Sequence, residues 1–455
     1  MECSSRSSRL RPLRCIMRIL VTSTSGIGHI HPMVPLATEL RMAGHEVVWA
    51  TAREACPTVE GLGFRSMPAG LAGSVRKGMF ALRAPGIGEI PPRRRRTIAF
   101  PLMFGEIAAP TMREELAIVF DELRPQLVLH ELAELAAAPM AIARGIPHVT
   151  VGFSGALSDE LVAVVLHSVS TVWALERVTQ TYRSFNGDLL LHPFPRSMDT
   201  PRSDGPSLPM GPQPFGGAMP DSPPDWVERF GAERSGIYVT FGTEMAQAGP
   251  WNAILEAMAD LPVDVVATVG RELDVAGLEP LPPNVRLARF VPQRFLLHRA
   301  SVVVSHAGAG TLTGAAVSGC AQLHMPLTAD QWENADMLAS TGAGLTLEAQ
   351  QRDAEAIGLA TSSSTDILAI CRNDLELRIL GVEAKVLEDF GPPVSSKRGA
   401  ASKGQKRAPC LPAHPAWRRA VRRLSSLSAL APHGVRLAHS TGVPCGGGCH
   451  ARSFT

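Results

Sequence analysis

The chain has 455 residues, 45% apolar and 19% charged, a balance typical of a globular protein with more than one domain. A formal net charge of +2 and only two tyrosines give no reason to expect a nucleic-acid partner, and no apolar run reaches the roughly 18–20 residues of an integral membrane segment. Of eight cysteines, only Cys56 and Cys320 lie in the part expected to fold. This usage favours a cytoplasmic chain without a disulfide framework.

The N-terminal region alternates strands with helices. Residues 1–16 carry four arginines and are expected to form a disordered extension, because a charged residue interrupts the apolar run that a secretory signal needs. The apolar run 18–24 predicts a strand, 32–44 a helix and 46–51 the next strand. This βαβ unit predicts a parallel sheet, and the same alternation continues with strand 126–130, helix 131–144 and strand 146–151.

A second α/β series follows a stretch rich in Pro and Gly, 193–224, which is the predicted linker. The series consists of strands 236–241, 263–269, 285–289, 301–305 and 320–325 with helices 250–260 and 310–318. The predicted fold class is therefore α/β, with two Rossmann-like domains, 17–192 and 225–358, that face each other across a cleft. Residues 359–455 are irregular and are expected to be disordered, apart from a short basic helix near 414–424.

Two loops of the second series contain glycine directly after a strand. Strand 301–305 ends at His306-Ala-Gly308-Ala-Gly310-Thr311, where a helix begins, and Gly242-Thr243 follows strand 236–241. Glycine lets the backbone approach a ligand, and free N–H groups at a helix N-terminus favour an anion. Because ligands bind at the carboxyl ends of the strands in such sheets, both loops indicate a diphosphate site. A tight turn without a ligand is the alternative for either loop alone.

Other nucleotide-binding signatures are absent from the sequence. Gly308-x-Gly310 and Gly26-x-Gly28 both lack the third glycine of a dinucleotide fingerprint, and no Gly-Lys-Ser/Thr phosphate loop occurs. These absences disfavour NAD-dependent enzymes and P-loop NTPases.

Four ordered motifs then resemble the donor-binding signature of family 1 glycosyltransferases. They are Phe290-Val291-Pro292-Gln293, His306 to Thr311, Pro326 to Ala335 with Asp330-Gln331, and Gly342-Ala-Gly344-Leu345. Within that family the chain is most similar to bacterial, erythromycin-type enzymes that glycosylate macrolides and other natural products. The similarity covers about residues 17–358 and implies the GT-B fold, with the acceptor in the first domain and the donor in the second.

The resemblance also implies roles for the matching side chains of the second domain. Phe290, where the family often has Trp, would stack on the nucleobase, and Val291 and Gln293 belong to the same motif, with Gln293 hydrogen-bonding the base. Asp330 and Gln331 would bind sugar hydroxyls. The diphosphate would be held by Gly242, Thr243, His306, Gly308, Gly310 and Thr311. No metal and no other cofactor is expected.

Two positions depart from the family pattern. Ala307 stands where the motif usually has a second Gly, and Gly314 stands where plant relatives often have a ribose-binding Glu. The loss of that Glu is compatible with a thymidine-diphosphate donor, whose deoxyribose lacks the 2′-hydroxyl.

In the first domain, Gly28-His29-Ile30-His31-Pro32 resembles the Gly-His-x-x-Pro motif whose His is the family's general base. Histidine suits this role because imidazole exchanges protons near neutral pH. Glu131, where relatives often have Asp, would orient the ring. The alternatives are that His29 only caps the helix, and that Glu134 is the partner or a surface residue.

The resemblance implies an inverting glycosyltransferase. It would move a hexose or deoxyhexose from a UDP- or dTDP-sugar to a hydroxyl of a small hydrophobic natural product, such as a macrolide or polyketide. One alternative is a sterol or glycolipid glycosyltransferase of the same fold, and another is a catalytically inactive relative that binds a nucleotide sugar. Relatives lack the unpatterned segment 359–413, so we hypothesise an unspliced or frameshifted insertion there. The sequence does not indicate an oligomeric state.

Two further clusters have weaker interpretations. The basic run Arg93–Arg96, within the weakly periodic segment 71–105, suggests an acceptor loop or a membrane-surface contact, and more simply a solvated loop. Cys445, Cys449 and His450 offer at most three metal ligands in a patternless tail, so no metal site is predicted there.

Overall fold

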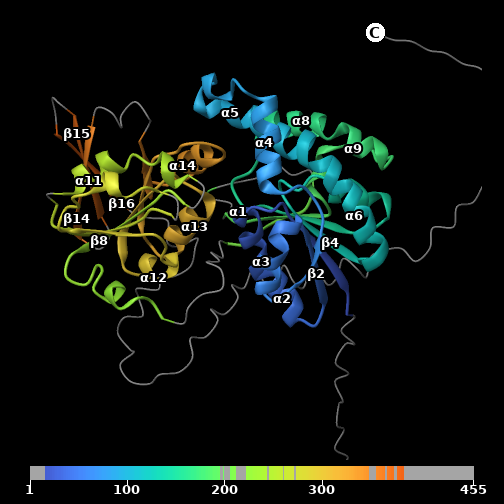
Figure 1. Ribbon diagram of the computed structural model, residues 1–455, viewed down its shortest axis with the longest axis horizontal. Helices are drawn as coiled ribbons and strands as arrows, with labels where there is room; N and C mark the ends of the chain where they lie inside the picture. Colours follow the sequence, from blue (N-terminus) through green and yellow to red (C-terminus); the bar gives the residue numbers. More distant parts are fainter. Residues whose placement is uncertain are drawn as a thin grey trace, which may run out of the picture.

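The structure, a computed structural model, contains two α/β halves built on separate sheets (Figure 1). It describes residues 16–194, 198, 205–211, 222–242, 245–259, 261–270, 273–347, 355–363, 366–373 and 377–383. Over these ranges, no helix has the length and hydropathy needed to cross a membrane.

The first half has a parallel sheet of seven strands in the order β3-β2-β1-β4-β5-β6-β7. Its strands are nearly continuous apolar runs, because both faces of the sheet are covered. In β1, Ile19 packs into one core and Leu20 into the other. The strands are β1 (Arg18–Thr22), β2 (Glu46–Thr51), β3 (Arg65–Pro68), β4 (Leu127–Glu131), β5 (His148–Val151), β6 (Leu189–His192) and β7 (Ser207–Pro209).

Helices cover both faces of this sheet. Leu36 and Leu40 of α2 pack into one core, and Leu116 and Phe120 of α6 into the other. The helices are α1 (Ile27–Ile30), α2 (Val34–Met42), α3 (Cys56–Gly61), α4 (Gly73–Arg83), α5 (Pro92–Phe100), α6 (Ala109–Leu123), α7 (Ala137–Ala143), α8 (Asp159–Ser168), α9 (Ser170–Leu175) and α10 (Tyr182–Asn186), with a π-helical segment, Pro101–Ala108, between α5 and α6.

The second half has a parallel sheet of six strands in the order β10-β9-β8-β11-β12-β13. The strands are β8 (Ser235–Thr240), β9 (Val263–Thr268), β10 (Val285–Ala288), β11 (Ala300–Ser305), β12 (Ala321–His324) and β13 (Gly344–Thr346). The helices are α11 (Trp251–Met258), α12 (Gln293–Leu297), α13 (Ala309–Val317) and α14 (Gln331–Ala339). A separate antiparallel sheet contains β14 (Glu355–Ser363), β15 (Asp366–Asn373) and β16 (Leu377–Glu383).

The α/β fold class with two Rossmann-like sheets is confirmed, and four local predictions are corrected. Strand β7 lies inside the predicted linker 193–224 and extends the first sheet. The helix predicted over 131–144 begins only at Ala137, and the weakly periodic segment 71–105 is largely helical. Strands β14, β15 and β16 lie at 355–363, 366–373 and 377–383, where irregular sequence was expected from 359 onward. Residues 1–15, the helix near 414–424 and the Cys445–His450 cluster lie outside the described residues.

The strand order places the two candidate sites. In each sheet, successive strands are added first towards one edge and then towards the opposite edge. This change of order falls between two central strands, β1 and β4 in the first half and β8 and β11 in the second. Ligands of open α/β sheets bind beyond the carboxyl ends of the strands at this switch point. The loops that follow β1, β4, β8 and β11 are therefore the expected binding edge. Figure 1 shows α13 and α14, which follow β11 and β12, on the side of the second half that faces the first.

Candidate active site

His29 lies in the first turn after β1, on the short helix α1. Its backbone N–H donates to the Gly26 carbonyl oxygen at 2.9 Å, which sets the turn. Gly26 must be small, because a β-carbon there would lie 2.9 Å from Cδ2 of the His29 ring. Gly28 has open space around its α-carbon. Gly26 thus makes room for the imidazole at the carboxyl edge of the sheet.

Glu131 is the partner of His29. His29 Nδ1 and Glu131 Oε1 are 3.1 Å apart, and the glutamate is fully buried at the end of β4. Thr24 donates to the same carboxylate through its N–H at 3.2 Å and its hydroxyl at 3.1 Å, and the Ala133 N–H donates to the other oxygen. Burial by itself raises the pKa of Glu131, but the His29 ring and these N–H donors outweigh it and hold the pKa below its ordinary value.

Two aromatic rings also pack against the His29 imidazole. The ring centroids of Phe104 and Phe153 lie 5.4 and 4.8 Å from that of His29. The His29 side chain keeps 18% of its surface exposed. Because Nδ1 faces Glu131, Nε2 is the ring nitrogen left to meet a ligand. This arrangement suits a base that removes a proton with Nε2.

Glu134, the alternative partner, has a different place. It is 2% exposed, so the alternative that Glu134 is a surface residue is excluded. Its carboxylate accepts from the Thr22 hydroxyl at 2.6 Å and from the Ala136 and Ala137 N–H groups at 2.8 and 3.2 Å, at the start of α7. Burial raises the pKa of Glu134 to about 7. These contacts explain why the helix begins late, and they leave Glu131 as the partner of His29.

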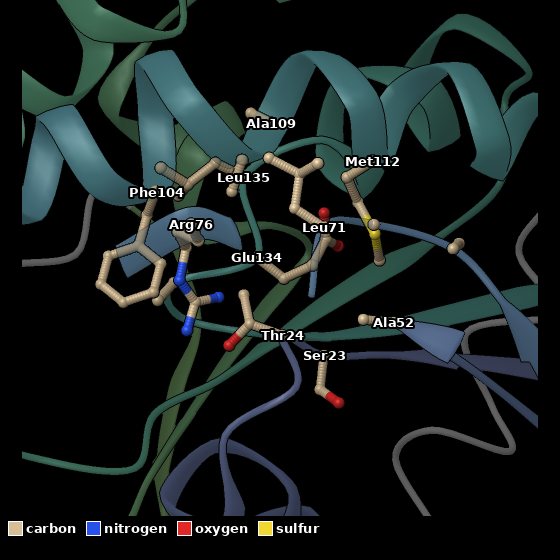
Figure 2. A pocket seen from close by; sticks show the side chains of 14 residues that line it. Ser23, Thr24, Ala52, Leu71, Arg76, Phe104, Ala109, Met112, Glu134 and Leu135 are labelled. Atoms are coloured by element: carbon tan, nitrogen blue, oxygen red, sulfur yellow. The ribbon is translucent and has the colours of Figure 1, made fainter. Parts of the chain in front are cut away.

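A hollow opens beside this pair at the carboxyl edge of the first sheet (Figure 2). The hollow is partly open to solvent. Phe104 borders both the hollow and His29, and Thr24 borders it while bonding Glu131. Its walls are mainly apolar, with the Arg76 guanidinium 5.0 Å from the Phe104 ring centroid. The other lining side chains include Ser23, Leu71, Ala109, Met112, Glu134 and Leu135.

In the second half, His306 follows β11 and lies between two glycines. A β-carbon at Gly308 would lie 2.5 Å from His306 Nε2, and one at Gly242 would lie 3.0 Å from Cε1. Gly242 also has a positive φ of 71°, which favours glycine. Burial lowers the pKa of His306 to about 4, although Asp330 nearby acts in the opposite direction. His306 is therefore neutral at pH 7 and can donate one ring N–H to a ligand.

The N-terminus of α13 completes the predicted diphosphate site. Gly308 is its N-cap residue and supplies no side-chain cap, and Gly310 has open space around its α-carbon. The Thr311 hydroxyl accepts from Gln293 Nε2 at 2.9 Å, so its own proton is available to a phosphate oxygen. The structure thus brings Gly242, His306, Gly308, Gly310 and Thr311 together. Thr243 lies outside the described residues.

In the motif predicted to bind the nucleobase, Phe290 is exposed and Val291 is buried. Phe290 is 59% exposed, an unusual state for a large aromatic residue and one that suits a stacking platform. Val291 is buried with Leu296 and Val303, so its side chain supports the loop and does not face a ligand. Gln293 begins α12 and reaches the start of α13 through Thr311.

Asp330 and Gln331 start α14. Gln331 Oε1 accepts from the Leu327 and Thr328 N–H groups at 2.8 and 2.9 Å, which leaves the amide nitrogen for a sugar hydroxyl. Asp330 Oδ2 accepts from Asn334 at 3.0 Å. Among the described residues, no group of three or more His, Cys, Asp or Glu side chains is placed to hold a metal ion.

The arginine run is helical and not a loop, and two of its side chains make contacts that sequence reasoning missed. It lies in α5, and Arg93 binds Asp336 of α14 through two nitrogens, at 2.6 and 3.3 Å. Arg93 also lies 4.8 Å from the Trp332 ring centroid, and Arg96 Nη1 is 3.1 Å from Glu333 Oε1. These contacts join the two halves next to Asp330 and Gln331. No local sequence pattern reveals partners so far apart in the chain.

Comparisons with known proteins identify a family and several similar proteins. The profile of the erythromycin biosynthesis protein CIII-like C-terminal domain matches residues 252–378. The chain is 33% identical over 353 residues to the L-demethylnoviosyl transferase of Streptomyces niveus, covering 76% of this chain and 88% of that protein. It is 28% identical over 386 residues to the aklavinone 7-beta-L-rhodosaminyltransferase of Streptomyces galilaeus, covering 75% and 86%.

Solved structures of glycosyltransferases are also similar to this chain. The glycosyltransferase VinC in complex with dTDP has a TM-score of 0.59 and 28% identity, covering 73% of this chain and 87% of that one. SsfS6 of Streptomyces sp. SF2575, complexed with thymidine diphosphate, has a TM-score of 0.58 and 25% identity, covering 72% and 87%.

Proposed function

Because the chain belongs to the family 1 glycosyltransferases of antibiotic pathways and has their GT-B fold, we propose that it transfers a deoxyhexose or hexose from a dTDP-sugar with inversion. The acceptor is a hydroxyl of a small hydrophobic natural product of the macrolide or polyketide type. The observation that carries this proposal is the His29–Glu131 pair, which lies beside an apolar hollow in one half of a molecule whose other half contains the predicted diphosphate-binding residues.

In the proposed reaction, the acceptor hydroxyl oxygen attacks the anomeric carbon while the bond from that carbon to the diphosphate oxygen breaks. His29 Nε2 takes the hydroxyl proton, and the Glu131 carboxylate stabilises the resulting imidazolium. A single displacement inverts the anomeric centre. The N–H groups at the start of α13, the Thr311 hydroxyl and the His306 ring N–H stabilise the departing diphosphate, so we propose that no metal is required.

Thymidine diphosphate is favoured as the donor nucleotide by two observations. Gly314, buried in α13, offers no side chain to a ribose 2′-hydroxyl. Two structural neighbours are described as complexes with thymidine diphosphate. The acceptor class is supported by the apolar lining of the hollow, which Phe104 borders (Figure 2). The ring of Phe104 also packs against the His29 imidazole.

The test combines donor binding with transfer. Calorimetry should show tighter binding of dTDP than of UDP, and mass spectrometry should show glycosylation of polyketide aglycones supplied with dTDP-sugars. The His29→Ala variant should lose transfer and keep its dTDP affinity. If His29→Ala retains transfer, His29 is not the base, and if the unaltered chain binds dTDP-sugars without any transfer, it is an inactive relative.

A further inference from the structure

Two turns of the donor site have alanine in a left-handed backbone conformation. Ala307, between His306 and Gly308, has φ of 63°, and Ala329, directly before Asp330, has φ of 55°. A β-carbon disfavours this conformation, so residues other than glycine adopt it where surrounding contacts impose it. Both alanines precede residues that we assign to donor binding. The contacts that hold these turns therefore bear on the geometry of the site.

One side chain, Asn334 of α14, joins the two turns. Its amide nitrogen donates to the Ala307 carbonyl oxygen at 3.1 Å and to Asp330 Oδ2 at 3.0 Å. Both hydrogens of the amide are thus used, one on each turn. Asn334 is 1% exposed, so water does not compete for these contacts.

The same side chain also meets the other half of the molecule. Asn334 Oδ1 accepts from the backbone N–H of Gly155 at 3.4 Å, a long hydrogen bond across the two halves. Gly155 closely follows Phe153, which packs against His29. The two halves therefore approach each other at this amide, next to the salt bridges between α5 and α14.

We propose that Asn334 is a positioning residue for the donor sugar. It fixes one oxygen of the Asp330 carboxylate against the phosphate-binding turn, so that the other oxygen faces the sugar hydroxyls in a defined direction. Without the amide, Asp330 is free to rotate and the Ala307 turn loses the contact that holds its carbonyl. The inference rests on the proposed function, because Asp330 binds a sugar only if the chain binds a nucleotide sugar.

The test is a double-mutant cycle of Asn334→Ala and Asp330→Ala, read out by calorimetric affinity for dTDP-glucose and for dTDP. The sugar-dependent part of binding is the ratio of the two affinities. Asn334→Ala should reduce this ratio by about 10- to 100-fold, the range for a hydrogen bond to a charged group. Asp330→Ala should reduce it to a similar extent, and the double variant should be no weaker than Asp330→Ala alone.

Asn284→Ala is the matched control. Asn284 also donates two hydrogen bonds to backbone carbonyls of the same half, those of Met258 at 2.8 Å and Leu261 at 3.2 Å, away from the site. It should lower the unfolding temperature without changing the affinity ratio. If Asn334→Ala fails to fold, Asn334→Ser is measured instead, because one hydroxyl proton can satisfy only one of the two turns.

The outcomes separate the two proposals. Effects of Asn334→Ala that add to those of Asp330→Ala, or that weaken dTDP and dTDP-glucose equally, overturn the positioning role while the proposed function stands. An unaltered chain that binds no nucleotide sugar overturns the proposed function and this inference with it.

Discussion

The buried carboxylate of Glu131 allows a quantitative test of the proposed base. In Glu131→Gln the shape of the side chain is kept and its negative charge is lost. Glu131 Oε1 lies 3.1 Å from His29 Nδ1, and the imidazole becomes positive as it takes the acceptor proton. Two unit charges centred about 4 Å apart attract by about 4 kcal/mol at an effective dielectric constant of about 20. At about 1.4 kcal/mol for each factor of ten, kcat should fall by about 10³-fold.

The assay measures initial rates of transfer at saturating donor and acceptor, together with dTDP affinity. The loss should appear in kcat, because the charge develops in the transition state and the donor site lies in the other half of the molecule. A fall in kcat below tenfold, in a variant with unchanged dTDP affinity and unfolding temperature, would refute the reasoning that Glu131 supports a charge on His29.

The remaining predictions concern stability, nucleobase binding and the His29 turn. Burial lowers the pKa of four histidines, to about 3 or about 4, and these are His130, His148, His306 and His324. Unfolding lets each take up a proton below its ordinary pKa of 6.5, so each should cost about 1.4 kcal/mol of stability per pH unit down to its folded pKa. Glu134, whose pKa burial raises to about 7, acts in the opposite direction and should offset about one histidine, so thermal unfolding at pH 7 and 5 should still show a net loss of stability at pH 5. Phe290→Ala should weaken dTDP binding by about 1–3 kcal/mol without altering the unfolding temperature, and unchanged affinity in calorimetry would mean that no base stacks there. Gly26→Ala should reduce kcat by displacing the His29 ring, since the new β-carbon would lie 2.9 Å from Cδ2; an unchanged kcat would show that the ring position is not critical.

Much of the site was predictable because its residues follow strands directly. His29 comes after β1, Glu131 ends β4 and His306 follows β11, so the parallel sheets alone place them at the binding edges. The spacing of glycines around His306 likewise indicated an anion site, and the structure adds that Gly242 and Gly308 also make room for the imidazole.

The features that were not predictable depend on contacts between distant parts of the chain. Strand β7 has only three residues and forms because β6 offers it an edge. Glu134 has a charged side chain, a type usually found at the surface. It is buried where its carboxylate accepts hydrogen bonds from the Thr22 hydroxyl and from backbone N–H at the start of α7. The partners of Asn334 lie in two turns and in the other half of the molecule, which no periodicity in one segment encodes.

The salt bridges between α5 and α14 have a consequence for protein engineering. Under the proposed function, one half selects the acceptor and the other the sugar, which invites chimeras that join halves from different enzymes. Arg93 and Arg96 form ion pairs with the acidic residues Asp336 and Glu333, close to Asp330 and Gln331 at the start of α14. A second half with basic residues at those positions would meet like charges at the junction. A second half should therefore be exchanged only if the charges of its α14 complement those of α5 in the first half. The crossover should be chosen by these charges and not only by the linker.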